Sequence, residues 1–267
     1  FMAINGVLEK NGYSLVCHII EDGQTIDTDI IRDIAADNIG ALIWSKSMEM
    51  NDMEKPDFLK NAMRNLSIPV ITMEKYGFDC PGVDILFDYE KGGYMATRHL
   101  IECGHRRIGC VAGKQSFHVT MQRLNGYKKA LEESGISYDP DLVYFGDYTM
   151  ESGYEAFSYI LGQKVTAIFS MNDEMAFGIY RAARLYGVSI PEDISIIGFD
   201  NVPFADVMQV PLTTIGVPVI EMGKKLGEKV VDLIDNKEKL KEREEILYTP
   251  RLLVRGSTKS IPPVTVI

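Results

Sequence analysis

The chain has 267 residues, of which 46% are hydrophobic, and its formal net charge is -10 at pH 7. This length accommodates one large α/β domain or two lobes, and the apolar content is sufficient for a substantial core. The acidic balance argues against binding of DNA, RNA or an anionic membrane surface by this chain itself, because phosphate contacts need a basic face.

Strand-like and helix-like patterns alternate through residues 7–112. Short apolar runs rich in β-formers predict strands, whereas apolar residues spaced three and four apart predict helices. The connections are short, and this alternation predicts a doubly wound, mostly parallel sheet. The predicted helices are residues 7–12, 27–38, 57–66 and 89–103, and the predicted strands are residues 13–20, 40–44, 69–73, 83–87 and 107–112.

A similar pattern follows residues 113–119, which we interpret as the boundary between two α/β lobes with a ligand-binding cleft between them. We interpret the apolar stretch 204–210 as a loop and the charge-dense stretch 235–245 as a solvated helix end or loop. Pro250 interrupts a strand-like stretch at 246–254. The other elements predicted here are helices 120–134, 151–162 and 219–234 and strands 142–145 and 213–215.

The most informative stretch is residues 165–201, which predicts a strand, a helix ending near Gly187 and a second strand. Such a β-α-β unit has parallel strands and a right-handed crossover. Asn172 and Asp200 then follow the carboxyl ends of two strands, where open α/β sheets bind ligands. An amide and a carboxylate there can hydrogen-bond hydroxyl groups. The structural alternatives are that Asn172 caps the helix and that Asp200 starts a turn.

The sequence contains no pattern that indicates catalysis. It lacks a nucleophile elbow, a phosphate-binding loop and a glycine-rich dinucleotide fingerprint, so we expect a non-enzyme without a cofactor. The stretch from His99 to His105 resembles a metal cluster, but a helix end at Gly104 would separate its side chains, and we expect no metal site. The cysteines show no paired spacing and indicate reduced thiols in a cytoplasmic protein; they are Cys17, Cys80, Cys103 and Cys110.

A set of motifs spans nearly the whole chain. It comprises DYEKGGYMATRHL (88–100), ECGHRRIG (102–109), RLNGY (123–127), ESGYE (151–155), ND (172–173), PEDIS (191–195), IGFD (197–200), PLTT (211–214) and LVRGST (253–258). In combination these motifs resemble the lactose/galactose-repressor family of transcriptional regulators.

The resemblance implies a type I periplasmic-binding-protein-like fold, in which two doubly wound, Rossmann-like lobes are joined by three crossovers. By resemblance, the crossovers are expected near residues 113–116, 215–218 and 247–250. The N-terminal lobe would then comprise residues 1–114 and 217–248, and the C-terminal lobe residues 115–216 and 249–260. The family's DNA-binding headpiece and first core strand are expected to lie outside this chain.

The resemblance also implies a set of ligand-binding residues. Arg123 matches the arginine that grips effector hydroxyls, and its five-donor fork suits two vicinal oxygens. Asn172 and Asp200 match the amide and the carboxylate of the sugar-binding set. The alternative for Arg123 is a surface salt bridge.

Three further residues complete the predicted site. Phe87 and Tyr148 occupy positions where the family places aromatic rings against the ligand, and Glu74 stands where many relatives have aspartate. Core packing is the alternative for Phe87, because aromatic side chains are usually buried. Residues 114–118 depart from the family's usual loop of small residues, which leaves the identity of the effector open.

The implied function is that of an effector-sensing core of a DNA-binding transcriptional repressor. The expected effector is a small polyol, a monosaccharide, that bridges both lobes and changes the affinity of the linked headpiece for operator DNA. We expect a cytoplasmic homodimer with no membrane contact, because the headpieces of the family act in pairs. The alternatives are a periplasmic sugar-binding protein that feeds a transporter, and an enzyme built on the same fold.

Overall fold

The computed structural model describes residues 1–18, 39–45, 61, 63–66, 68–78, 80–236 and 243–262. The chain forms two compact units. Unit 1 comprises Phe1–Phe87 and Pro218–Tyr248, and unit 2 comprises Asp88–Val217 and Thr249–Ile267. The chain therefore passes between the units three times. Among the described residues, no helix is both long and apolar enough to cross a bilayer.

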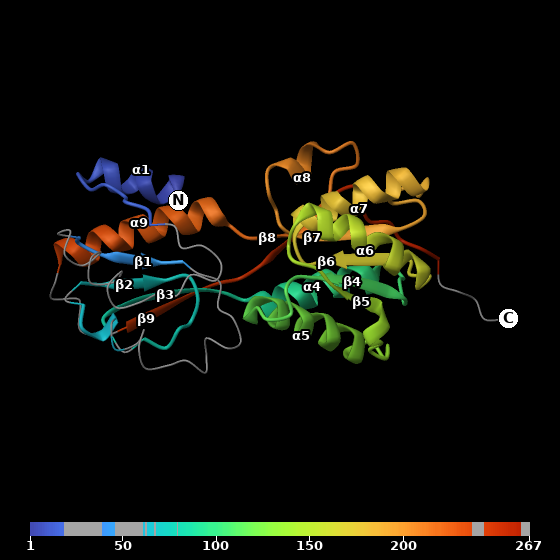
Figure 1. Cartoon of the computed structure of the whole chain (residues 1–267), viewed down its shortest axis with the longest axis horizontal. Helices are drawn as coiled ribbons and strands as arrows, with labels where there is room; N and C mark the ends of the chain where they lie inside the picture. Colours follow the sequence, from blue (N-terminus) through green and yellow to red (C-terminus); the bar gives the residue numbers. More distant parts are fainter. Residues whose placement is uncertain are drawn as a thin grey trace. The chain divides into compact units, whose positions relative to one another are not determined.

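Unit 1 contains a four-stranded parallel sheet in the order β1-β2-β3-β9. Its apolar cluster contains Trp44, Met63, Val70, Phe78 and Cys80. Helices α1 and α9 pack against each other and lie on one face of the sheet (Figure 1). The elements are α1 (Met2–Lys10), β1 (Leu42–Trp44), β2 (Val70–Thr72), β3 (Gly82–Phe87), α9 (Val219–Asp235) and β9 (Arg243–Tyr248).

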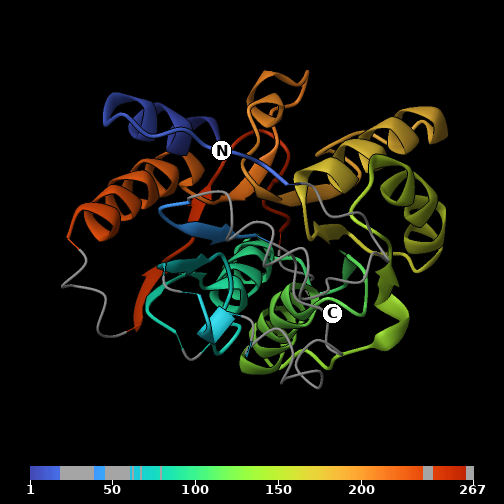
Figure 2. The same ribbon diagram turned by 60° about the vertical axis from the view of Figure 1, so that its left-hand side comes forward.

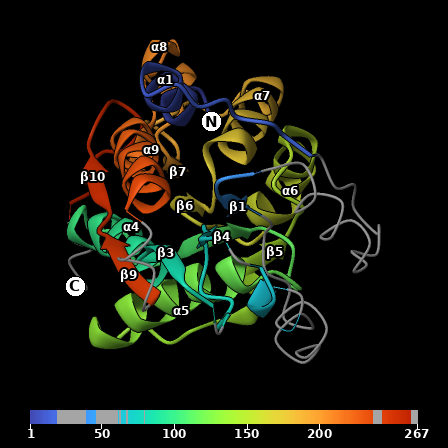
Figure 3. The same cartoon turned by 90° about the vertical axis from the view of Figure 1, so that its left-hand side faces the viewer.

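Unit 2 contains a six-stranded sheet in the order β10-β8-β7-β6-β4-β5, in which only β10 is antiparallel to its neighbour. Helices α4 and α5 lie side by side on one face, and α6 and α7 cover the other (Figures 2 and 3). The helices are α4 (Tyr89–Glu102), α5 (His118–Glu133), α6 (Met150–Gly162), α7 (Asp173–Tyr186) and α8 (Phe204–Val207). The strands are β4 (Ile108–Ala112), β5 (Val143–Phe145), β6 (Ala167–Ser170), β7 (Ser195–Asp200), β8 (Thr213–Gly216) and β10 (Arg251–Leu253).

The first passage between the units differs from the predicted position. It lies between Phe87 and Asp88 rather than near residue 114. β4 is hydrogen-bonded between β5 and β6, and α4 packs along α5, so both belong to unit 2. The loop after Gly113 joins β4 to α5 within one sheet. The predicted boundary at residues 113–119 is therefore a connection inside a unit and not a boundary between units.

Several predicted elements also differ in detail. Residues 13–18 are not assigned to a strand, and residues 19–20, the predicted helix 27–38 and most of helix 57–66 lie outside the described residues. The apolar loop 204–210 contains the short helix α8. The strand-like stretch 246–254 is divided at Pro250 between β9 and β10, which belong to different sheets. β9 begins inside the stretch that we interpreted as a solvated segment, because Arg243 is bound within unit 1.

Candidate functional site

The carboxyl ends of β6 and β7 lie at one edge of the unit 2 sheet, as the β-α-β pattern predicts. The two strands are parallel neighbours. Asn172 is the N-cap of α7, directly after β6, and Asp200 is the last residue of β7. Asp200 and Asn201 have φ angles of 109° and 58°, which non-glycine residues rarely adopt. The chain therefore leaves β7 through an unfavourable left-handed turn that carries the carboxylate of Asp200.

Arg123 of α5 lies against this turn with its side chain only 7% exposed. Its Nη1 donates to the carbonyl oxygen of Met171, and its Nη2 lies 3.4 Å from Oδ1 of Asp200. Its buried Nε has no hydrogen-bond partner among the described residues. A buried donor without a partner is unfavourable by about 1–3 kcal/mol. The guanidinium is thus held in place with hydrogen-bonding capacity left over.

Aromatic rings surround the guanidinium of Arg123. Its Cζ lies 3.8 Å from the ring centroid of Phe199, 5.0 Å from that of Tyr89 and 5.8 Å from that of Tyr148. Guanidinium groups are attracted to aromatic faces at such distances, and the attraction is stronger where water is excluded. The rings therefore offset part of the cost of burying this cation, and they fix the plane in which its donors lie.

Tyr148 is held from two sides. Its hydroxyl is hydrogen-bonded to Thr120 Oγ1 at 2.7 Å, and its ring stacks on Phe117 with centroids 6.2 Å apart. A Cβ at Gly113 would lie 2.0 Å from the Tyr148 ring. Gly113 therefore makes room for the ring. The backbone of Tyr148 has a φ angle of 74°, which is unusual for a residue other than glycine.

Asn172 makes the capping bond that the structural interpretation predicts. Its Oδ1 accepts a hydrogen bond from the backbone N–H of Met175 at 2.9 Å, and its Nδ2 donates to the carbonyl oxygen of Tyr148 at 2.8 Å. The side chain thus joins the start of α7 to the loop that carries Tyr148. An amide has one further acceptor and one further donor position, so this role does not exhaust its hydrogen-bonding capacity.

The two carboxylates of the site have raised pKa values. Burial raises the pKa of Asp200, although the nearby Arg123 opposes the shift. Burial also raises the pKa of Asp173 to about 7, against the opposing effect of the hydrogen bonds that it accepts from Thr214 and from the backbone N–H of Val202. Asp173 enters the sequence prediction only within the ND motif and has no predicted role in the site. Its position directly after Asn172 gave no indication that it is fully buried.

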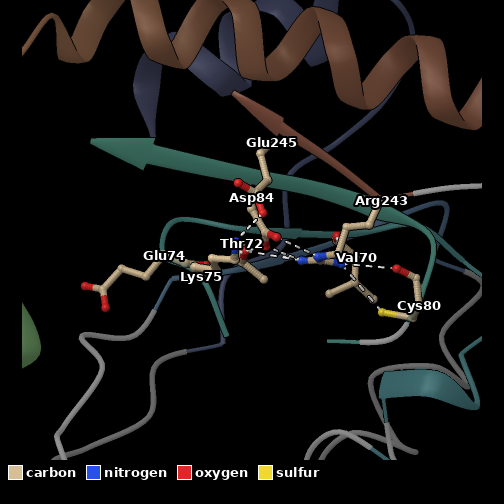
Figure 4. Close-up of polar contacts among 8 residues, drawn as sticks. All are labelled: Val70, Thr72, Glu74, Lys75, Cys80, Asp84, Arg243 and Glu245. Carbon is tan, nitrogen blue, oxygen red and sulfur yellow. Dashed lines mark hydrogen bonds and ion pairs between the residues drawn. The ribbon is translucent and has the colours of Figure 1, made fainter. Parts of the chain in front are cut away.

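Phe87 and Glu74 belong to unit 1, whereas the other four predicted site residues belong to unit 2. Phe87 ends β3, is 7% exposed and pairs in register with Tyr248 of β9. Glu74 follows β2 and is half-buried, and its carbonyl oxygen accepts a hydrogen bond from Thr72 at 2.7 Å. Figure 4 shows its side chain pointing away from the polar cluster around Arg243. Within unit 2, the described contacts connect Arg123, Asn172, Asp200 and Tyr148.

Unit 1 contains a buried arginine–aspartate pair, which sequence reasoning missed (Figure 4). The Nε and Nη2 of Arg243 donate to the two carboxylate oxygens of Asp84 at 2.9 and 2.5 Å. Its Nη1 donates to the carbonyl oxygens of Val70 and Cys80 at 3.2 and 3.3 Å. Thr72 Oγ1 lies beside the same carboxylate and accepts a hydrogen bond from Nη2 of Arg243 at 3.2 Å. This bidentate arrangement ties β9 to β2 and β3, and each guanidinium nitrogen of Arg243 has a hydrogen-bond partner.

Comparisons with known proteins agree on one family. The sequence profile described as periplasmic binding protein-like domain matches residues 97–258. The chain is 33% identical over 264 residues to the HTH-type transcriptional repressor PurR of Photobacterium profundum, covering 97% of this chain and 77% of that protein. It is 36% identical over 248 residues to the HTH-type transcriptional regulator DegA of Bacillus subtilis, covering 92% and 72%. The chain belongs to the LacI family of transcriptional regulators.

Solved structures of LacI-family proteins share the fold. The transcriptional regulator CelR in complex with cellobiose superposes with a TM-score of 0.81 at 28% identity, covering 96% of this chain and 77% of that one. A LacI-family regulator from Enterococcus faecium with bound ribose has a TM-score of 0.77 at 27% identity, covering 97% and 92%. The predicted family and fold class are confirmed. The chain is the effector-binding core of a LacI-family regulator, and these relatives are regulators rather than enzymes.

Proposed function

We propose that this chain senses a small polyhydroxylated molecule, a monosaccharide, and that Arg123, Asn172, Asp200 and Tyr148 contact it. The observation that carries the proposal is the buried guanidinium of Arg123, whose Nε lacks a partner among the described residues and which lies beside a partly exposed carboxylate. Such a donor fork suits two vicinal hydroxyl oxygens, and Asp200 accepts from hydroxyl groups. A sugar completes hydrogen bonds that the unliganded protein leaves unmade.

Phe87 and Glu74 are proposed to contribute to the same ligand from unit 1. A ligand held by residues of both units binds one arrangement of the units more tightly than others and so shifts their population. Two solved LacI-family relatives carry ribose and cellobiose, which supports a sugar as the class of effector for this chain. The proposed output is a change in operator affinity through a DNA-binding headpiece outside residues 1–267, in the cytoplasm. Membership in a family of regulators favours this role over sugar delivery to a transporter.

We also propose that the regulator acts as a homodimer through unit 2. Phe204 and Val207 of α8 are 58% and 72% exposed, and Phe204 contacts the largely buried Phe177 edge to face at 5.3 Å. Exposed apolar groups that gather in one place indicate an association surface. Sedimentation at micromolar concentration should show a dimer, and Phe204→Asp should make it a monomer. A monomeric parent, alone and with its headpiece attached, contradicts this part of the proposal.

A thermal-shift screen tests the ligand assignment. The parent is tested against monosaccharides, disaccharides and nucleobases, and the active compound is then tested on Arg123→Ala, Asn172→Ala and Asp200→Ala. Removing one partner leaves a buried polar group of the sugar unpaired, at a cost of about 1–3 kcal/mol, so binding should weaken about tenfold or more. The matched control is Arg181→Ala, which removes an exposed arginine of the same unit. If all three site variants respond as Arg181→Ala does, the site has been assigned wrongly.

A further inference from the structure

Asp173 is a fully buried carboxylate whose hydrogen bonds join three elements of unit 2. It is the first residue of α7. Its Oδ1 accepts a hydrogen bond from Thr214 Oγ1 of β8 at 2.6 Å, and its Oδ2 accepts one from the backbone N–H of Val202 at 2.9 Å. Val202 follows the left-handed turn that begins at Asp200. One carboxylate therefore attaches that turn to a helix start and to a neighbouring strand.

The fit around this carboxylate is close. A Cβ at Gly198 of β7 would lie 2.2 Å from Asp173 Oδ1. Only a glycine therefore lets the carboxylate approach the backbone of the strand that carries Asp200. The far side of the turn is restrained separately, because Arg255 donates to Asn201 Oδ1 at 2.7 Å. Non-glycine residues persist at positive φ only where their surroundings determine the conformation, and these contacts are such surroundings for residues 200 and 201.

The turn decides where the carboxylate of Asp200 points. Asp200 contacts Arg123 at 3.4 Å and keeps 36% of its side chain exposed, so this contact alone holds it weakly. We propose that Asp173 is the positioning residue of the ligand site: its buried carboxylate fixes the turn that presents Asp200 beside Arg123. This inference rests on the proposed function of those two residues and assigns Asp173 no contact with the ligand.

Three variants separate positioning from a general contribution to stability. Asp173→Ala removes both acceptors. Asp173→Asn is the conservative variant, because its amide oxygen can accept from Val202 while its amide N–H₂ donates to the hydroxyl of Thr214. The matched control is Ser195→Ala: Ser195 is also fully buried and hydrogen-bonded, to His105, but it lies at the opposite end of β7 from Asp200. The control should lower the melting temperature without moving the turn.

The first readout needs no ligand. The pKa of the Asp200 carboxyl, followed by carbon-13 NMR, should fall toward its ordinary value in Asp173→Ala, because a released turn lets the carboxylate move into water. It should stay at the parent value in Asp173→Asn and in Ser195→Ala. If Asp173→Ala does not fold, Thr214→Val removes the hydroxyl donor to Asp173, and it should change the Asp200 titration in the same direction.

The second readout is calorimetric titration with D-ribose. Asp173→Ala should weaken binding about tenfold, as does loss of a ligand partner, whereas the other two variants should stay near the parent affinity. If the parent does not bind D-ribose, ribose is excluded as the monosaccharide of the proposed function, and the Asp200 titration still decides the role of Asp173. The positioning role is overturned if the Asp200 carboxyl of Asp173→Ala titrates as in the parent, or, where Asp173→Ala does not fold, if that of Thr214→Val does.

Discussion

The pairs Arg123–Asp200 and Arg243–Asp84 each contain a largely buried arginine, but they differ in how completely their hydrogen bonds are made. In unit 1, Arg243 binds both carboxylate oxygens of Asp84 and two backbone carbonyl oxygens. In unit 2, Arg123 has one carbonyl partner, one contact of 3.4 Å to Asp200 and an Nε without a partner among the described residues. The arginine side chains are comparably buried, at 14% and 7% exposure.

The same chemical groups can therefore serve two purposes. A buried ion pair offsets the cost of removing two charges from water only if its geometry is good and its remaining donors are satisfied. Arg243 and Asp84 meet that condition, and their pair holds strands together. Arg123 and Asp200 do not meet it within the described residues, and a ligand with hydroxyl groups can supply what is missing. Unmade hydrogen bonds of the arginine and the partial exposure of the carboxylate, rather than charge, distinguish the candidate site from a structural cluster.

The largest expected effect follows from Arg243→Met. This change leaves Asp84, which is 2% exposed, as a buried carboxylate without its cation. Breaking a buried pair in this way costs about 3–5 kcal/mol. Unfolding can be followed by the fluorescence of Trp44, the only tryptophan of the chain, which lies in the apolar cluster of unit 1. A decrease in the free energy of unfolding of less than about 1 kcal/mol would show that the Arg243–Asp84 pair does not hold the sheet together.

The same substitution in the other pair should have a smaller effect on the unliganded protein. Arg123→Met keeps much of the apolar volume against Phe199, and Asp200 remains partly exposed to water. We expect the free energy of unfolding to change by about 1 kcal/mol or less, with loss of sugar-induced stabilisation. Circular dichroism melts with and without the active sugar measure both effects. Equal destabilisation by Arg243→Met and Arg123→Met would remove the distinction between the pairs.

A pH dependence of stability is expected from the buried carboxylate of Asp173. The pKa of Asp173 is about 7 in the folded protein, against an ordinary value of 3.8. Because the folded state binds this proton more tightly, the contribution of Asp173 to stability is present below about pH 4 and is lost as the pH rises through about 7. The free energy of unfolding of the parent, minus that of Asp173→Asn, should fall as the pH rises, by at most about 1.4 kcal/mol for each pH unit. A difference independent of pH between 4 and 8 contradicts this expectation.

The smallest effect concerns the part of the candidate site that is hydrogen-bonded in the unliganded state. Asn172→Ala removes the cap of α7 and the bond to the Tyr148 carbonyl oxygen. Loss of a cap costs about 1 kcal/mol, so the unliganded protein should melt at a slightly lower temperature. Asn172→Asp keeps an acceptor for the Met175 N–H and should recover most of the loss. Melting temperatures that do not distinguish the two variants would show that the cap contributes little.

The sequence predicted those features that depend on local pattern. The β-α-β unit places Asn172 and Asp200 at one sheet edge because strand order and crossover handedness follow from the elements themselves. The arrangement of Arg123 beside Asp200 was expected only through the family resemblance, since α5 lies far from β7 in the sequence. The described structure places these residues, with Tyr148, in one connected group.

Other features depend on contacts that no local pattern contains. Arg243 and Asp84 are 159 residues apart in the sequence, and Arg243 lies in a charge-dense stretch that is typical of a solvated segment. The passage at Phe87 and Asp88 has no glycine or proline to mark it, whereas Gly113 marks a loop inside unit 2. The burial of Asp173 is created by β7 and β8. The sequence around the start of α7 therefore gave no sign that this residue is buried.

The most direct test of the contrast between the pairs follows the Nε–H signals of Arg123 and Arg243 by nitrogen-15 NMR, assigned with the two Arg→Met variants. The protein is titrated with the sugar that raises its melting temperature in the screen. The predicted result is a large, saturable shift of the Arg123 signal, as its Nε gains a partner, while the Arg243 signal does not move. A stabilising sugar that leaves the Arg123 signal in place would contradict the assignment of this site.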